Sequence, residues 1–151
     1  MRAAEATPAD ADTWAEFRHA LWPDQPLAEL AADVHDFFDK GTPLIAAGFL
    51  AWDGLQAVGF LELSVRPYVP GADPVSAPFI EGWFVEPGSR GKGVGRMLVE
   101  AAEDWARSKG YTQLGSDALM ENVASAEAHE ALGFRTVELL RSFIKDLDDV
   151  T

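Results

Sequence analysis

Cysteine is absent from this chain of 151 residues, and its three histidines are scattered along the sequence. Without thiols the chain can form no disulfide, no thiolate metal site and no cysteine nucleophile. The separated histidines also show no metal-ligand spacing. We therefore expect no metal cofactor.

Long hydrophobic runs are missing as well. The longest apolar stretch extends from Leu44 to Trp52, which is too short to span a bilayer. The first residues, Met1 to Glu5, lack the apolar core of a signal peptide. A secreted protein without cysteine would also fit the composition, but these features together favour a soluble protein in the reducing cytoplasm.

Basic residues are few: 12 lysines and arginines stand against 25 acids, which gives a formal net charge of -13. A nucleic acid or an anionic membrane is therefore not an expected partner, because both bind basic surfaces. A polycationic small molecule would be attracted by such a field. Charge alone favours the simpler interpretation, that the acids only keep the protein soluble.

The length and a hydrophobic content of 48% predict one folded domain, spanning residues 1–151. Apolar periodicity and turn residues predict helices and strands in alternation. This order implies an α/β or α+β sheet with helices on its faces. The first expected helix starts at Thr7 and stops before Pro23, and the others cover 26–39, 94–108 and 122–132. The expected strands cover 43–52, 56–66, 77–85, 113–118 and 134–145, with a possible short strand at the start.

One glycine-rich segment, from Val85 to Arg96, joins an expected strand to the cleanest amphipathic helix. Glycine permits a positive φ and a close approach of the backbone to a ligand. The free N–H groups at a helix start attract anions, and nearby basic side chains add charge. The segment therefore predicts a pyrophosphate cradle, the alternative being a turn that only lets the helix pack.

Two other phosphate-binding motifs do not match this segment. A Walker A motif requires serine or threonine after the lysine, but Lys92 is followed by Gly93. A dinucleotide-binding fingerprint requires a third small residue where Arg96 stands.

The run Arg90-Gly91-Lys92-Gly93-Val94-Gly95 resembles the Arg/Gln-x-x-Gly-x-Gly/Ala signature of the GNAT acetyltransferase superfamily. Val85-Glu86-Pro87 resembles its lead-in, and Asn122 with Ala131-Leu132-Gly133-Phe134 resembles its next motif. The resemblance implies a central mixed, mostly antiparallel sheet with helices on both faces and acetyl-CoA as co-substrate. The residues that it implies for acetyl-CoA binding are Trp83, Phe84, Val85, Arg90, Gly91, Lys92, Gly93, Val94, Gly95, Arg96 and Asn122.

A narrower resemblance is to the aminoglycoside 6'-N-acetyltransferases. It is carried by Leu21-Trp22-Pro23-Asp24, Leu61-Glu62 with Arg66 and Tyr68, Phe79-Ile80-Glu81-Gly82, Ser116-Asp117-Ala118, and His129 with Ala131-Leu132-Gly133-Phe134. It implies acetyl transfer to the 6'-amine of an aminoglycoside, often by a homodimer. The aminoglycoside pocket would be lined by two aromatic and three acidic residues: Trp22, Tyr68, Glu81, Asp117 and Glu138.

Glu81 is the most informative of these acids, because it interrupts an apolar strand where an unpaired carboxylate is costly to bury. Gly82 beside it suggests a bulge or a close backbone approach. The alternatives are a solvated Glu81 or one paired with an arginine. Asp117 could be a simple turn residue, and Glu138 could lie on the polar face of a half-exposed strand.

An acceptor ammonium must lose a proton before its nitrogen attacks a thioester, and a carboxylate can accept that proton. Glu81 is the first candidate for this base and Asp117 the second. A backbone N–H near Val85 is the expected donor to the oxyanion. His129 stands where many superfamily members carry a tyrosine acid, and the general acid stays unassigned.

Two other functions remain open at this point. The chain could be a GNAT enzyme for another amine, such as a polyamine or a protein N-terminus, or a non-catalytic acyl-CoA sensor. The expected C-terminal strand, 134–145, would be exposed, which favours a homodimer.

Overall fold

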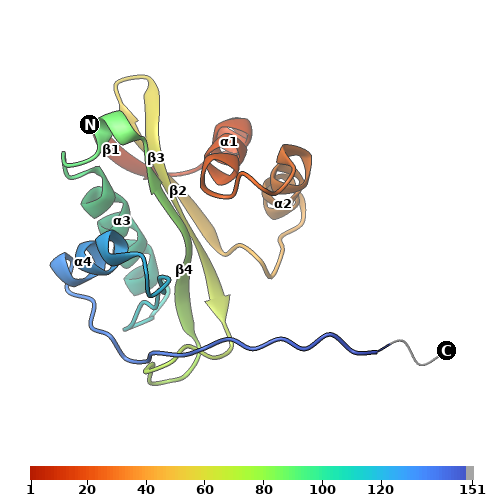
Figure 1. Ribbon diagram of the computed structural model, residues 1–151. Coiled ribbons are helices and arrows are strands. Elements are labelled where there is room, and N and C mark those ends of the chain that lie inside the picture. Colours follow the sequence, from red (N-terminus) through yellow and green to blue (C-terminus); the bar gives the residue numbers. More distant parts are fainter. Residues whose placement is uncertain (149–151) are drawn as a thin grey trace.

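A four-stranded antiparallel sheet forms the centre of the computed structural model, which describes residues 1–148 (Figure 1). The strands follow chain order across the sheet, and Gly54, with φ of 60°, turns the hairpin between the second and third. The expected short first strand is present. The strands are β1 (Arg2–Glu5), β2 (Ala47–Asp53), β3 (Gln56–Arg66) and β4 (Ala77–Val85).

Helices cover both faces of the sheet, as Figure 1 shows. On one face lie α1 (Ala11–Leu21) and α2 (Leu27–Asp39), and on the other lie α3 (Val94–Ser108) and α4 (Val123–Ala131). A 3-10 turn, Pro8–Asp10, leads into α1, and the backbone N–H of Thr7 donates to the Asp10 carboxylate at 2.9 Å. The expected fold class is therefore confirmed.

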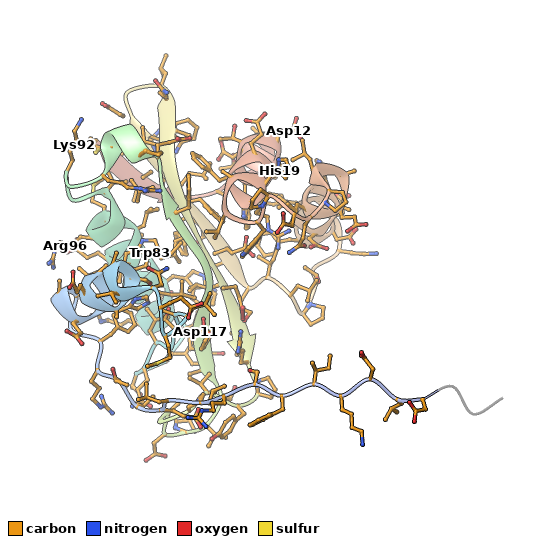
Figure 2. The ribbon with its side chains drawn as sticks, in the orientation of Figure 1. Asp12, His19, Trp83, Lys92, Arg96 and Asp117 are labelled. Atoms are coloured by element: carbon orange, nitrogen blue, oxygen red, sulfur yellow. The ribbon has the colours of Figure 1, made fainter. Side chains whose placement is uncertain are left out.

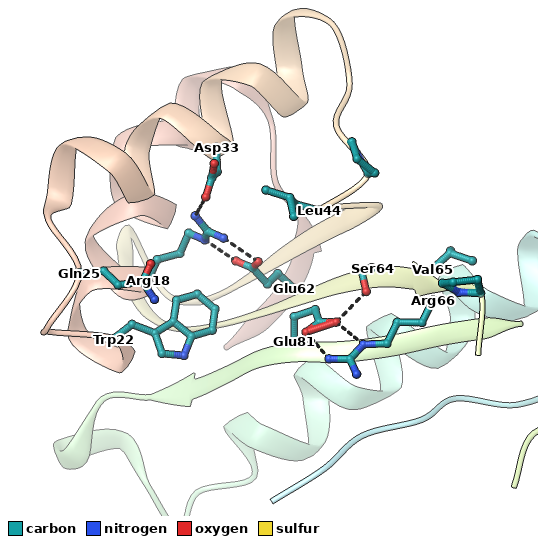
Figure 3. A pocket seen from close by; sticks show the side chains of 12 residues that line it. Arg18, Trp22, Gln25, Asp33, Leu44, Glu62, Ser64, Val65, Arg66 and Glu81 are labelled. Atoms are coloured by element: carbon teal, nitrogen blue, oxygen red, sulfur yellow. Dashed lines mark hydrogen bonds and ion pairs between the residues drawn. The ribbon is translucent and has the colours of Figure 1, made fainter. Parts of the chain in front are cut away.

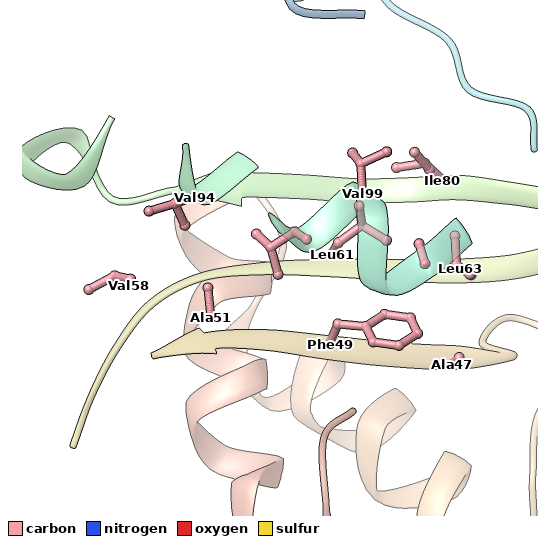
Figure 4. Packing of buried hydrophobic residues seen from close by; sticks show 11 residues of the cluster. Ala47, Phe49, Ala51, Val58, Leu61, Leu63, Ile80, Val94 and Val99 are labelled. Carbon is pink, nitrogen blue, oxygen red and sulfur yellow. The ribbon is translucent and has the colours of Figure 1, made fainter. Parts of the chain in front are cut away.

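The sheet separates two main clusters of the hydrophobic core, and a smaller third cluster contains Val69, Ala77 and Phe79. The cluster under α3 joins Leu98, Val99 and Ala102 to inward-facing side chains of β2, β3 and β4 (Figure 4). The cluster under α1 and α2 contains Trp14, Val34, Leu50 and Phe60. Burial of both faces explains why the first half of β3, from Ala57 to Leu61, carries no polar side chain.

A β-bulge interrupts the pairing of β3 with β4. Glu62 pairs with Gly82 and Leu63 pairs with Ile80, so Glu81 is the extra residue on β4. The bulge expected from Gly82 is thus confirmed. It changes the alternation of the strand: Ile80 packs under α3, whereas Glu81 and Gly82 both face α1 and α2.

Three expected strands differ from the structure. The strand expected from residue 43 begins at Ala47, because Thr42 and Ile45 pair across a small turn. Residues 113–118 form only a parallel bridge between Gly115 and Phe79, after which the segment leaves β4.

The expected C-terminal strand, 134–145, is wrong for the single chain. Figure 1 shows residues after α4 extending away from the sheet, and within residues 1–148 they form no strand pairing. Apolar alternation predicts an extended backbone, but it does not supply the neighbouring strand that a sheet requires. Among the described residues, no helix has the length and apolar character needed to cross a membrane.

Candidate active site

A cavity of about 400 Å³ opens on the α1/α2 face of the sheet, next to the bulge in β4 (Figure 3). Side chains from α1, α2, β3, β4 and the loops between them form its wall. The lining residues are Arg18, Trp22, Gln25, Asp33, Pro43, Leu44, Glu62, Ser64, Val65, Arg66, Pro67 and Glu81.

Glu62 forms the buried inner wall of this cavity, with a side chain that is 1% exposed. Its carboxylate accepts hydrogen bonds from Trp14 Nε1 at 3.0 Å, Arg18 Nε at 2.8 Å and Arg18 Nη2 at 3.2 Å. Arg18 also donates to the Leu30 carbonyl at 2.9 Å and to Asp33 at 3.0 Å. This network ties α1 and α2 to β3.

Burial by itself would lower the pKa of Arg18, but the hydrogen bonds and charges of Glu62 and Asp33 outweigh burial and raise it. Arg18 therefore remains a guanidinium, and Glu62 stays bound to it. Because Glu62 and its guanidinium partner are both buried, at 1% and 7% exposed, a substrate proton has little access to this carboxylate, so Glu62 is a structural residue of the wall.

Glu81 lies closer to the cavity mouth and has a different partner. Its Oε1 accepts hydrogen bonds from Ser64 Oγ at 2.8 Å and Arg66 Nε at 2.7 Å, and its Oε2 accepts one from Arg66 Nη2 at 2.9 Å. The Arg66 side chain is 40% exposed and that of Glu81 26%. The Arg66 guanidinium carbon also lies 3.7 Å from the centre of the Phe79 ring.

The charge of Glu81 follows from these contacts. Burial disfavours ionisation, but the hydrogen bonds from Arg66 and Ser64 outweigh it and lower the pKa of Glu81. The hydrogen bond with Glu81 likewise raises the pKa of Arg66. The carboxylate is therefore ionised and chemically available as a base at neutral pH, but a guanidinium stands beside it. Of the alternatives considered for Glu81, pairing with an arginine is therefore the one found in the structure.

The structure brings together some of the expected substrate residues and separates others. Trp22, directly after α1, lines the cavity with Glu81, and its ring lies 5.2 Å from the Arg18 guanidinium carbon. Asp117 is exposed and outside the lining, but its charge contributes to raising the pKa of Arg66. Tyr68, 62% exposed, and Glu138, on the extended C-terminal segment, do not line the cavity.

Six polar residues of this cavity were not expected to be site residues from the sequence. They are Arg18, Gln25, Asp33, Glu62, Ser64 and Arg66. A signal for three of them exists, because polar side chains recur at every second position of β3, at 62, 64 and 66. A period of two places them on one face of the strand.

On the opposite face, the turn before α3 has an open backbone. Gly91 and Gly93 have φ values of 76° and 83°, and a Cβ at either position would meet nothing within 4 Å. A Cβ at Gly95 would instead lie 3.1 Å from the Trp83 ring, so this glycine serves packing. Lys92 and Arg96 are exposed on the outer side of this region (Figure 2).

The end of β4 leads into that turn. Trp83 and Val85 pack on the α3 side, whereas the Phe84 ring lies 6.1 Å from Phe17 on the α1 side. Phe84 can therefore serve a ligand on the α3 side only through its backbone. Arg90 folds back and donates from Nε to the Val85 carbonyl at 2.8 Å.

These features fit a CoA thioester. Beyond Ile80 the outer edge of β4 is unpaired within residues 1–148, and amide groups of an extended ligand can hydrogen-bond to such an edge. The indole N–H of Trp83 is buried and has no hydrogen-bond partner in the described chain. The free N–H groups at the start of α3 suit a pyrophosphate.

His129 belongs to α4, and its ring lies 5.3 Å from the ring of Trp83 on β4. Its Nδ1 is 2.7 Å from the Ser125 carbonyl oxygen, which can only accept, so Nδ1 carries the proton of the neutral ring. Nε2 then accepts a hydrogen bond from Ser116 Oγ at 2.7 Å. Neutral His129 consequently has no proton to donate from Nε2. Asn122 caps α4 by accepting from the Ser125 N–H at 3.1 Å.

The profile of the acetyltransferase (GNAT) family matches residues 14–134. An aminoglycoside N(6')-acetyltransferase type 1 from Klebsiella aerogenes is 41% identical over 149 residues, covering 97% of this chain and 96% of the relative. The structure of AAC(6')-Iy in complex with the bisubstrate analogue CoA-S-monomethyl-acetylneamine is 32% identical, with a TM-score of 0.87 over 96% of this chain and 97% of that one. The apo structure of aminoglycoside 6'-N-acetyltransferase AAC(6')-IG from Acinetobacter haemolyticus is 34% identical, with a TM-score of 0.84 over 98% and 100% of the two chains.

Proposed function

Because this chain belongs to the acetyltransferase (GNAT) family, we propose that it transfers the acetyl group of acetyl-CoA to the 6'-amine of an aminoglycoside. The observation that carries this function is the position of Glu81. The bulge presents its ionised carboxylate to a cavity that is lined by acidic residues. The same strand, β4, has an open outer edge and ends at the glycine turn before α3, which is the proposed CoA-binding segment. The reaction is a direct attack of the amine, without a covalent enzyme intermediate.

Acetyl-CoA supplies the activated acyl group as its thioester. The backbone N–H groups of residues 91–95 bind its pyrophosphate, with Arg90, Lys92 and Arg96 adding positive charge. The backbone of β4 at residues 83–85 forms hydrogen bonds with the pantetheine arm, in the way that a sheet edge binds an added strand. Asn122 lies at the start of α4, on the same side of the sheet, and completes the proposed binding residues.

Glu81 acts as the general base and removes a proton from the acceptor ammonium, directly or through a water. Asp117 is the second candidate for this role. The amine nitrogen then forms the new C–N bond, and a backbone N–H near Val85 donates to the carbonyl oxygen as that oxygen gains negative charge. The C–S bond then breaks, CoA leaves as its thiolate, and the second proton lost by the nitrogen protonates that thiolate. Any acid function of His129 would have to pass through the Ser116 hydroxyl, because Nε2 is an acceptor in the neutral ring.

The acceptor site attracts a polycation by charge. Glu81, Glu62 and Asp33 line the cavity, Asp117 lies near its Arg66 side, and Trp22 provides an aromatic wall. Tyr68 would join this site through movement of the exposed loop that carries it. The role of Glu138 in substrate binding depends on where the C-terminal segment docks.

We also propose a homodimer. The extended residues after α4 expose large apolar side chains that a single chain leaves in water, and a second copy of the chain would cover them. The side chains, 51% to 95% exposed, are Val137, Leu139, Leu140, Phe143, Ile144 and Leu147.

Analytical ultracentrifugation of the wild-type protein tests the homodimer and should give twice the mass of the chain. The double substitution Phe143→Glu with Ile144→Glu should produce monomers. Leu55→Glu, at a fully exposed hairpin position, is the matched control and should remain dimeric. A monomeric wild-type protein at micromolar concentration would disprove this assembly.

We further propose that the chain is one domain and acts in the cytoplasm. The sheet with its four main helices accounts for residues 2–131 as one layered unit. Acetyl-CoA is a metabolite of that compartment. Cell fractionation would test the location, and a single cooperative unfolding transition would test the domain organisation.

A thiol-release assay tests the activity. Kanamycin A carries the 6'-amine and should release CoA, whereas an analogue with a 6'-hydroxyl should not. Equal rates with the two compounds would move the reaction to another amine. Activity with neither compound but with a polyamine or a peptide N-terminus would make this chain a GNAT enzyme for that acceptor.

A further inference from the structure

Arg66 occupies the one position in the cavity where a cation meets the proposed base. Its guanidinium forms two hydrogen bonds with the Glu81 carboxylate, at 2.7 and 2.9 Å, and this pair lies beside the space that the acceptor must enter. An acceptor ammonium needs the same carboxylate. The guanidinium and the ammonium therefore compete for one site.

We propose that Arg66 is an exchangeable counter-ion. In the free enzyme its guanidinium occupies the position beside the Glu81 carboxylate that the acceptor ammonium takes, and it leaves this position when the acceptor binds. This inference rests on the proposed function of the site. It assigns Arg66 a role in setting the affinity for the acceptor and gives the reaction a binding step in which one cation replaces another.

The attachment of Arg66 is suited to such an exchange. Among the described residues its polar contacts are with Glu81 alone, its ring contact is the face of Phe79, and 40% of the side chain is exposed. Arg18, by contrast, is 7% exposed and bonds to Glu62, Asp33 and the Leu30 carbonyl. Releasing Arg66 thus breaks few contacts and moves it toward water.

A destination for the released guanidinium is also present. Asp117 is exposed and close enough for its charge to raise the pKa of Arg66. Moving from Glu81 toward Asp117 would keep Arg66 near a carboxylate. The charge of the site would then stay balanced while the ammonium takes over at Glu81.

Exchange has a consequence for affinity. Every acceptor gains the Glu81 contact at the expense of the Arg66 contact, so this contact alone gives a small net gain. A polycation places further ammonium groups near Asp33 and Asp117 and binds through them as well. The cost of displacing Arg66 is common to both kinds of acceptor, so Arg66 lowers the affinity of each by the same factor.

The test compares two acceptors, kanamycin A and the monoamine 6-amino-6-deoxyglucose, with wild-type enzyme and Arg66→Gln. For the variant, we expect KM for both acceptors to fall about 3- to 5-fold, the effect of removing one partly exposed competing ion pair. Isothermal titration without acetyl-CoA should show the same decrease in both dissociation constants.

Two control variants keep this test decisive. Arg107→Gln removes one positive charge from an arginine on α3 that is 66% exposed, and it should leave both KM values at wild-type levels. Arg66→Lys retains an exchangeable cation and should keep both KM values near the wild-type level. Thermal unfolding should verify that each variant is folded.

The acid limb of the pH profile provides a second readout. The groups that face Glu81 are Ser64 and Arg66 from β3, Arg18 with its partner Glu62 across the cavity, Asp33 from α2, and Asp117. In Arg66→Gln the carboxyl of Glu81 loses its strongest stabilising partner, so the acid limb of kcat/KM should move to higher pH. In Arg107→Gln it should not move.

A turnover rate reduced by about an order of magnitude or more in Arg66→Gln, without tighter binding of the monoamine, would overturn the exchange and make Arg66 a fixed partner that orients Glu81. Unchanged KM and pH profile would overturn it as well. Failure of the proposed function is separate from both outcomes, because it would show as a wild-type enzyme that is inactive with kanamycin A.

Discussion

Two arginine–glutamate pairs face the same cavity, yet they differ in what surrounds them. Arg18 and Glu62 are buried and linked to Trp14, Asp33 and a backbone carbonyl. Arg66 and Glu81 are partly exposed at the mouth of the cavity. The same pair of side chains is thus a structural clamp in one place and a chemically accessible group in the other.

The physical reason is the number of partners and the access of water. A buried ion pair that loses one member leaves a desolvated charge behind, which is strongly unfavourable. A partly exposed pair can exchange its partner for water or for a ligand ion at little cost. The comparison predicts effects of decreasing size, on folding, on catalysis and on acid stability.

The largest effect is expected from breaking the buried pair. Arg18→Met should lower the free energy of unfolding by about 3–5 kcal/mol, because Glu62 would remain charged and buried without its main partner. Arg66→Met should lower it by about 1 kcal/mol or less. Urea unfolding of both variants measures the difference.

The double substitution Arg18→Met with Glu62→Met is the control for this interpretation. It removes both charges and should recover much of the stability lost in Arg18→Met. Equal losses in Arg18→Met and Arg66→Met would mean that burial does not distinguish the two pairs.

At the partly exposed pair, Arg66 and Glu81, we expect a smaller change in free energy, which appears as a loss of catalytic activity. Glu81→Gln should reduce kcat/KM for kanamycin A about 100-fold, equivalent to about 2.7 kcal/mol, because the amide cannot accept the proton. Binding of CoA should remain at the wild-type level, since Glu81 faces the other side of the sheet. Thiol release and CoA titration are the two measurements.

Asp117→Asn is the matched comparison for the base. A loss in this variant that exceeds the loss in Glu81→Gln would reverse the order of the two candidates and place the proton acceptor on the segment that leaves β4.

The smallest effect is expected on the free energy of unfolding as the pH is lowered. The pKa of Glu81 is lowered in the folded protein, so its ion pair contributes stability above the ordinary pKa of a glutamate, and this contribution is lost as the pH falls through the lowered pKa. Because the pair is partly exposed, the contribution should be about 1 kcal/mol or less. Wild-type enzyme and Glu81→Gln should therefore differ slightly in unfolding free energy at pH 7 and converge in acid.

Urea titrations at several pH values would measure this convergence. A difference between the two proteins that grows as the pH falls would contradict the direction of the pKa shift at Glu81.

The helices, the four strands and the glycine turn could be predicted from local patterns. Periodicity identified α3 because Val94, Leu98 and Ala102 recur on one face, and all three are buried. The placement of Glu81 in an apolar strand beside Gly82 pointed to the bulge that the pairing of β3 with β4 contains. These features depend on residues close together in the chain.

The partners within the site could not be predicted in the same way. Sequence reasoning treated Glu81 as the acid of interest but did not assign its partner, and it did not include Glu62 among the site residues. The C-terminal segment shows the same difficulty, since its apolar pattern was interpreted as a strand although the single chain offers it no neighbour. Pairing is a property of the assembled sheet.

By itself, the sequence determined the layered fold, the family resemblance and the glycine turn, because each rests on local periodicity and short motifs. Only the tertiary structure decided that Arg18 meets Glu62 across 44 positions and that Arg66 meets Glu81 across 15. Those contacts follow from packing α1 on β3 and from the bulge in β4. The resulting burial, which no local pattern contains, separates a clamp from an accessible base.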